Sequence, residues 1–175
     1  ALSYYIAPTE EEVEAYFTEH ESDYAETGIT RSSGKLVDIR HILLIPQVPE
    51  DGTGTVTVAP DGTVTCSEEL WDACLASAQT LVEDYEKALA ADSRRGDNRS
   101  TNDAIFADLA NKNSADAGSA LDGGLYQKLH KGQLTPVLDD WCFDDARQSG
   151  DVDILRSGLG YHIVFFQGST DIWYD

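Results

Sequence analysis

Two short runs of large apolar residues, far apart in the chain, constrain its fold more than any other feature. They are residues 42–45 (ILLI) and residues 163–166 (IVFF). Each run is short, and Pro46 ends the first, as is typical of a buried central strand. We therefore predict two core strands, at residues 36–45 and 161–166, which any fold of this chain must bury together.

Turn signals predict two hairpins. Residues 152–155 and 161–166 flank the glycine-rich stretch 157–160, so we expect two strands joined by a tight turn. Residues 46–66 are rich in Thr, Val, Gly and Pro, with an Asp-Gly pair at 61–62 between two alternating Thr/Val runs. This second segment is predicted to be an inserted surface hairpin.

Capping residues and apolar spacing predict four helices. They are a short helix at 9–20 that starts with a Thr9/Glu12 capping box, a long helix from a second box at Thr65/Glu68 to about Ala90, a shorter helix marked by Ile105, Phe106 and Leu109, and a helix that Thr135 caps, Pro136 opens and Gly150 stops. The polar stretches between them predict a connector at 28–34, a loop at 92–102 and a turn-rich bend at 113–124. This order of strands and helices indicates the α+β class.

Composition and charge exclude several classes of function. With 175 residues, 41% of them hydrophobic, the chain can bury the core of one ordinary domain plus an appended segment. A net charge of −20 repels phosphate backbones, so no nucleic-acid partner is expected. No run of about 18 apolar residues predicts a membrane span. The chain starts at Ala1 without a signal-peptide pattern, which is compatible with anchoring through a segment that precedes it.

The three cysteines do not indicate a metal site. Cys66, Cys74 and Cys142 lack metal-type spacing. If Cys66 and Cys74 lay on one helix, they would be roughly 12 Å apart, too far for a disulfide. We therefore expect buried free thiols.

A series of short motifs occurs in a characteristic order. They are RHIL at 40–43, FADLA at 106–110, SADAGS at 114–119, GG at 123–124, KGQL at 131–134, GDV at 150–152 and GYHIV at 160–164. Together they resemble the parvulin-type (PpiC, rotamase) peptidyl-prolyl cis/trans isomerases, and most of all the extracytoplasmic parvulin-like foldases of Gram-positive bacteria. The resemblance covers about residues 37–167, interrupted by the hairpin and by the loop at 92–102.

The resemblance implies a parvulin-like fold of the FKBP-like superfold. We expect a small antiparallel or mixed sheet of about four strands covered by about four helices. The implied organisation is an N-terminal helical extension and connector at 1–35, an isomerase domain at 36–168 with the inserted hairpin at 46–66, and a C-terminal tail at 169–175.

The resemblance also implies four catalytic residues. The family's pair of core histidines corresponds to His41 and His162, its nearby Asp or Cys to Asp116, and a hydroxyl in the turn before the last strand to Ser157. We favour a role in which the histidines orient the site over nucleophilic or acid/base catalysis. The alternatives are that the histidines only fix the core, and that Asp116 only forms a turn.

Substrate-binding residues follow from the same pattern. The apolar proline pocket corresponds to Leu134 and Leu138, with Tyr126 at its wall and Gln133 at its polar edge. Tyr126 stands where the family usually has Leu, and the two leucines replace the more frequent Met and Phe, so we expect an altered pocket shape. No cofactor is implied. A metal site of His41, His162 and Asp116 is conceivable, but two imidazoles that satisfy each other leave no open donor set, so no metal is predicted.

The predicted function is peptidyl-prolyl isomerisation in extended, proline-containing polypeptides, which assists the folding of exported proteins. The alternative is a non-catalytic parvulin-fold chaperone or client-binding module. Phosphate-directed parvulins carry a basic cluster after the first strand, whereas no Lys or Arg occurs here between Arg40 and Lys87, so phosphoserine specificity is not expected. The implied location is extracytoplasmic in a bacterium, either secreted or anchored at the cell surface.

Overall fold

The computed structural model describes residues 7–91 and 99–174. The chain divides into two compact units. One consists of Ala1–Leu36 with Ser169–Asp175, and the other is Val37–Gly168. None of the helices within the described ranges is long and apolar enough to cross a bilayer.

The first unit contains two short helices, α1 (Glu10–Glu19) and α2 (Glu21–Glu26). The capping box predicted at Thr9 is confirmed, because its side chain accepts the amide of Glu12 while the Glu12 carboxylate accepts the amide of Thr9. α2 was not predicted. Phe17 is the buried residue of α1, and its ring lies 5.0 Å from that of Trp173, which fixes the helix within the unit.

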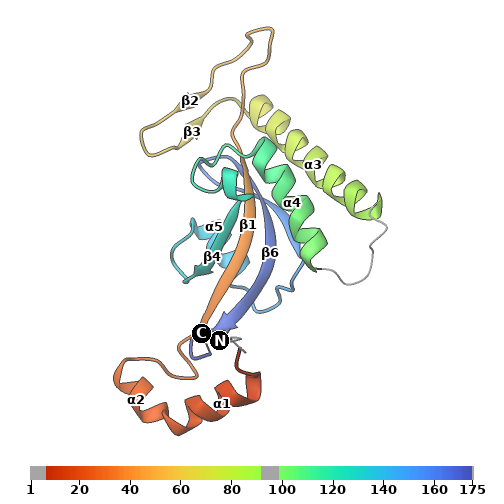
Figure 1. The fold of residues 1–175 in the computed structure, drawn as a ribbon. Helices are drawn as coiled ribbons and strands as arrows, with labels where there is room; N and C mark the ends of the chain where they lie inside the picture. Colours follow the sequence, from red (N-terminus) through yellow and green to blue (C-terminus); the bar gives the residue numbers. More distant parts are fainter. Residues whose placement is uncertain (1–6, 92–98, 175) are drawn as a thin grey trace, which may run out of the picture. The chain divides into compact units, whose positions relative to one another are not determined.

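The second unit is built on a four-stranded sheet in the order β4-β1-β6-β5. The strands are β1 (Lys35–Leu44), β4 (Leu125–Leu129), β5 (Val152–Arg156) and β6 (Tyr161–Asp171). Figure 1 shows β1 and β6 side by side and running in opposite directions, so that the sheet is antiparallel. Both predicted core strands and the predicted β5–β6 hairpin are confirmed.

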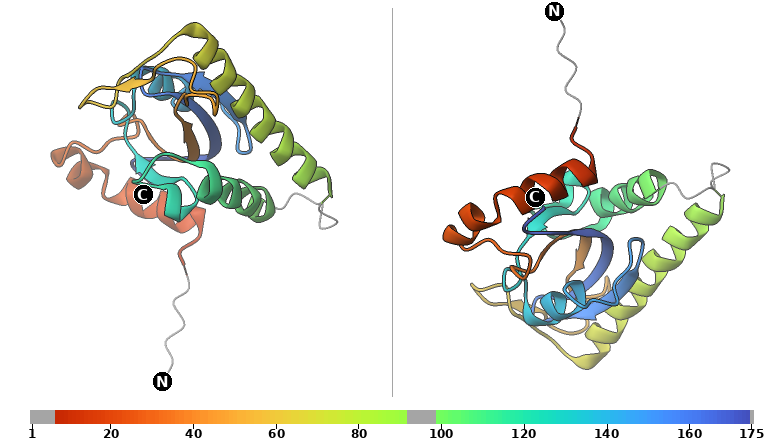
Figure 2. Two further views of the ribbon diagram at one scale, coloured as in Figure 1. Left: turned by 90° about the horizontal axis from the view of Figure 1, so that it is seen from above. Right: turned by 90° about the horizontal axis from the view of Figure 1, so that it is seen from below.

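The two faces of the sheet carry different helices, because side chains alternate along each strand. On one face, Ile42 and Phe165 pack with α3 (Glu68–Ala91) and α4 (Arg99–Asn113). On the other face, Ile39 and Val164 pack with α5 (Pro136–Cys142). In both views of Figure 2, α3 and α4 form a V whose open end faces β1 and β6.

The inserted hairpin is confirmed as a small two-stranded sheet of β2 (Thr57–Val58) and β3 (Val64–Thr65). Its strand β3 contacts the β5–β6 turn, where the amide of Val64 donates to the carbonyl of Gly158 at 2.7 Å. The capping box predicted at Thr65 is wrong, because Thr65 belongs to β3. The helix begins at Glu68, and the Ser67 carbonyl accepts its first amides.

Two other predicted boundaries need correction. α5 ends at Cys142 and not at Gly150, because the Asp144 carboxylate accepts the amide of Ala146 at 2.9 Å and so stabilises a turn directly after the helix. The predicted loop at 92–102 is wrong for its last residues, because α4 begins at Arg99. Residues 92–98 lie outside the described part of the chain.

All three cysteines are free thiols. Cys74 and Cys142 are buried as predicted, whereas Cys66, which precedes α3, is only partly buried. Burial raises the pKa of the Cys142 thiol to about 12, so this thiol stays protonated at neutral pH.

Candidate active site

The two predicted histidines meet at the centre of the sheet. His41 shares the sheet face of Ile39, and His162 shares that of Val164, so both rings lie on the face that packs against α5. Their Nδ1 atoms are 3.4 Å apart, and the rings are nearly parallel, at 14°. Only 7% of His41 and 3% of His162 is exposed, so the pair is held away from bulk water.

The Asp116 carboxylate continues the pair on one side. Its Oδ2 atom lies 2.9 Å from His41 Nε2 and also accepts the hydroxyl of Tyr126 at 3.0 Å and the hydroxyl of Ser119. Its Oδ1 atom accepts the amide of Gly118 at 3.2 Å. The carboxylate is therefore surrounded by donors from three separate parts of the unit.

Ser157 continues the pair on the other side. Its Oγ atom lies 2.7 Å from His162 Nε2 and accepts the amide of Leu159 at 3.0 Å. The structure thus brings together all four residues predicted to be catalytic. It places them in the order Ser157, His162, His41, Asp116.

These contacts assign every proton in the series. An ionised Asp116 only accepts, so His41 donates from Nε2, and a neutral His41 then presents a lone pair at Nδ1. His162 must then donate from Nδ1, which leaves its Nε2 to accept the hydroxyl proton of Ser157. For neutral imidazoles, the hydrogen bonds therefore run in one direction, from Ser157 to Asp116.

Electrostatics agree with this assignment. Burial raises the pKa of Asp116, but hydrogen bonds from Ser119, His41 and Tyr126 outweigh burial and hold that pKa well below its ordinary value. Burial and, to a smaller extent, the neighbouring His41 lower the pKa of His162 to about 4, while Asp116 opposes the change. His162 is therefore neutral at physiological pH.

A β-bulge turns Tyr126 towards the site. Val37 pairs with Leu129 and Ile39 with Tyr126, so two steps along β1 correspond to three steps along β4. The bulge in β4 contains Lys128, which has a left-handed backbone conformation (φ 52°) and whose amide donates to the side chain of Asp38 at 2.7 Å. Without the bulge, Tyr126 and Leu129 would point to opposite faces, and the Tyr126 hydroxyl could not reach Asp116.

Steric constraints explain why the second of the paired glycines is a glycine. Gly124 has φ 72°, and its carbonyl accepts the amide of His41 at 2.9 Å. A Cβ atom at Gly124 would lie 2.1 Å from the carbonyl oxygen of His41. Only glycine lets the chain pass this close to the histidine, because it combines a positive φ with the absence of a side chain.

The predicted substrate-binding residues differ in how deeply they are buried. Leu134 is partly buried against the α5-side core, whereas Leu138 is a core residue with only 3% exposed. Gln133 is exposed, and its side-chain oxygen accepts the amide of His130 at 2.8 Å, so it also stabilises the turn before α5. The proline pocket at these positions stays a prediction.

Sequence reasoning missed two serines of the site. The Ser119 hydroxyl binds the Asp116 carboxylate, and Ser114 Oγ accepts the amides of Leu43 and Asp116, which ties the turn to β1. Aspartate commonly accepts groups two and three residues further along a turn. The spacing of Asp116, Gly118 and Ser119 could therefore have predicted the first of these contacts.

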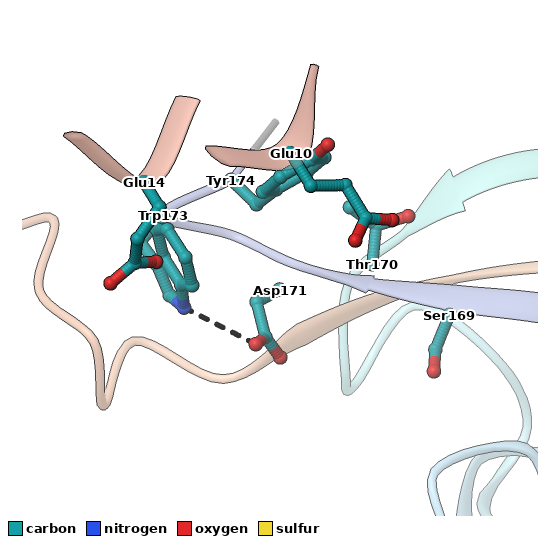
Figure 3. A pocket seen from close by; sticks show the side chains of 7 residues that line it. All are labelled: Glu10, Glu14, Ser169, Thr170, Asp171, Trp173 and Tyr174. Carbon is teal, nitrogen blue, oxygen red and sulfur yellow. Dashed lines mark hydrogen bonds between the residues drawn. The ribbon is translucent and has the colours of Figure 1, made fainter. Parts of the chain in front are cut away.

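Two further features of the described residues concern a metal site and a second pocket. Within residues 7–91 and 99–174, no group of three or more His, Cys, Asp or Glu side chains is arranged to hold a metal ion. The first unit contains a separate pocket of about 400 Å³, which includes none of the predicted site residues (Figure 3). Its lining residues are Glu10, Glu14, Ser169, Thr170, Asp171, Trp173 and Tyr174.

Comparison with known proteins places this arrangement in a family. The family described as the PPIC-type PPIASE domain matches residues 76–169. Foldase protein PrsA 2 of Listeria monocytogenes is 27% identical over 165 residues, which cover 89% of this chain and 53% of that protein. Chaperone SurA of Chromohalobacter salexigens is 42% identical over 82 residues, 45% of this chain and 17% of that protein. The chain spans about half the length of the PrsA 2 relatives.

A solved structure supports the fold. A structure of the SurA-like chaperones PEB4 and Cj1289 of Campylobacter jejuni superposes with a TM-score of 0.50 at 18% identity, covering 94% of this chain and 48% of that one. At this identity the likeness concerns the fold alone. The family match spans more than half of the chain and includes Asp116, Ser157 and His162. The chain therefore belongs to the family of PPIC-type, or parvulin-type, peptidyl-prolyl isomerase domains.

Proposed function

We propose that this chain is an active peptidyl-prolyl cis/trans isomerase domain that assists the folding of exported proteins. The observation that carries the proposal is the one-directional series of hydrogen bonds from Ser157 to Asp116, on the sheet face that α5 covers with apolar residues. Membership of the family supports the same reaction.

The reaction requires no bond cleavage. Rotation about a peptide bond is opposed by about 18 to 20 kcal/mol, because twisting removes amide resonance. The cis and trans forms of an X-Pro bond differ by only about 0.5 to 1 kcal/mol. A catalyst therefore has to stabilise only the twisted amide, which has less charge separation than the planar one and is favoured in apolar surroundings.

The apolar side chains around α5 are suited to hold a proline ring. Those partly buried against the core of this face are Tyr126, Leu134, Val137, Trp141, Phe143 and Leu155. In this proposal Leu134 contacts the ring and Leu138 supports it from the core, while the flanking backbone of the client is held by hydrogen bonds.

The histidines orient the site and do not transfer protons. Both nitrogens of each ring have a partner, and the low pKa of His162 keeps that ring neutral. Neither ring has a free nitrogen lone pair with which to attack an amide carbon. Their role is to fix the position and the field of Asp116 next to the bound amide.

We propose proline-containing polypeptides as clients and an extracytoplasmic location. The support is that the relatives include a foldase and a chaperone, and that one similar solved structure concerns a periplasmic protein. Anchoring at the membrane stays a prediction from the sequence.

A protease-coupled isomerisation assay on a panel of X-Pro peptides tests the proposal. We expect acceleration at catalytic concentrations of the domain, and faster refolding of a protein whose folding is limited by proline isomerisation, an unaided step of tens to hundreds of seconds. Peptide binding by calorimetry without any acceleration would instead establish a non-catalytic binding module.

A further inference from the structure

We propose that Ser119 and Tyr126 are positioning residues of this site, which hold the Asp116 carboxylate ionised and so determine which nitrogen of His41 carries the proton. The inference rests on the proposed isomerase function. In this inference the Tyr126 hydroxyl binds the Asp116 carboxylate. The resemblance implied only that the Tyr126 side chain forms part of the wall of the proline pocket.

Three donors converge on one oxygen. The hydroxyls of Ser119 and Tyr126 and the Nε2–H group of His41 all point to Asp116 Oδ2. An ionised carboxylate only accepts hydrogen bonds, and hydrogen bonds to charged groups are stronger than neutral ones. A protonated Asp116 would have to place its own hydrogen among these donors or lose the amide of Gly118 at Oδ1. The geometry therefore fits the ionised form alone.

Both residues are themselves held in place. Ser119 is only 2% exposed, and its carbonyl accepts the amide of Gly124, whose carbonyl in turn accepts the amide of His41. Tyr126 reaches the carboxylate because of the bulge in β4, and its ring meets that of His41 at 61° with centroids 5.3 Å apart. Each donor is thus fixed to the same strand that carries His41.

The titratable groups facing Asp116 come from three strands. His41 of β1 and Tyr126 of β4 bind it directly, and the charge of Asp116 also acts on His162 of β6. Burial alone would raise the pKa of Asp116, and the donors reverse this effect. Removal of either hydroxyl therefore raises the pKa of Asp116. It also reduces the preference of His41 for the tautomer with its proton on Nε2.

The experiment compares Ser119→Ala, Tyr126→Phe and the double variant with the wild type. NMR follows the ¹³C titration of the Asp116 carboxyl group and the ¹⁵N shifts of His41, which distinguish the two neutral tautomers. We expect a higher Asp116 pKa in each single variant, a larger rise in the double variant, and a mixture of His41 tautomers there. We expect kcat/KM to fall about tenfold in the double variant with little change in KM.

Tyr85→Phe is the matched control, because it removes the hydroxyl of another buried tyrosine, on α3 at the opposite face of the sheet. It should leave the Asp116 titration, the His41 tautomer and turnover unchanged. A folded double variant with wild-type NMR titrations, or with wild-type turnover, overturns the inference. An inactive wild type contradicts the proposed function instead, and the titrations still test the role of the two hydroxyls.

Discussion

The Nδ1 atoms of His41 and His162 face each other across 3.4 Å between the two central strands of the sheet. Asp116 binds His41 Nε2, and Ser157 binds His162 Nε2. The Nδ1 atom of each ring is therefore left to bind the other ring. The pair is therefore a single buried unit whose members depend on one another for hydrogen bonding.

This dependence predicts non-additive stability. His41→Ala and His162→Ala should each lower the free energy of unfolding by about 1 to 3 kcal/mol, because each opens a small void and leaves a buried partner unsatisfied. The double variant should lose less than the sum, since both changes remove the same contact. Urea melts measure all three values, with the exposed His130→Ala as a control near zero. Strict additivity would mean that the two rings do not interact.

The same pair predicts a loss of stability in weak acid. The pKa of His162 is about 4 in the fold and 6.5 in the unfolded chain, so between these values the unfolded state binds a proton that the folded state excludes. Stability is then full above pH 6.5 and falls by roughly 3 kcal/mol as pH drops to about 4. Asp116 acts at lower pH: its pKa is depressed in the fold, so its contribution is present above about pH 3.9 and is lost as pH falls further.

Urea melts at a series of pH values measure this slope. His162→Gln removes the titrating group, so the variant should be less stable at neutral pH and should lose the slope between pH 6.5 and 4. An equally steep slope in a folded His162→Gln protein would assign the acid sensitivity to another group.

The sequence predicted the centre of the fold better than its edges. The apolar run of β6 is buried throughout, and that of β1 is buried or partly buried, so both strands could be predicted from short runs of apolar residues. β4 was missed because only Leu129 of its five residues is buried and a bulge interrupts its alternation. α2 was missed because it buries no residue and so has no apolar pattern to detect.

The residues of the candidate site were predicted from the family resemblance, and their geometry required the structure. The family pattern brought His41, His162, Asp116 and Ser157 together, although they come from distant segments. The role of the Tyr126 hydroxyl could not be predicted, because a single-residue bulge in β4 decides which face this side chain occupies.

Leu134→Glu should abolish turnover of X-Pro peptides while leaving the domain folded. Leu134 is partly buried against the α5-side core, so a carboxylate there stays hydrated and excludes an apolar proline ring. Leu121→Glu is the matched control, because Leu121 is 93% exposed and lies in the 3₁₀ helix η1 (Ala120–Asp122), away from α5 in the sequence. Circular dichroism and the coupled assay measure both properties. Undiminished turnover in Leu134→Glu would place the proline elsewhere.

A phosphoserine before proline should be turned over no better than serine. A phosphate needs free cations, and the hairpin segment between β1 and α3 contains no Lys or Arg.

The arginines of β1 and β5, Arg40 and Arg156, already have partners. Arg40 binds both oxygens of Asp103 and the carbonyls of Asp122 and Gly123. Arg156 binds Glu68 and lies over the ring of Trp71, with 4.1 Å to the centroid.

The net charge of −20 adds long-range repulsion against a phosphopeptide. We therefore expect kcat/KM for a phosphoserine-proline peptide to lie below that for its serine counterpart at low ionic strength. The difference should shrink as added salt screens the repulsion, because the Debye length falls to about 3 Å at 1 M salt. The coupled assay with the two peptides at low and high salt measures both effects. A preference for the phosphopeptide that weakens with salt would instead reveal a cationic subsite and contradict this assignment.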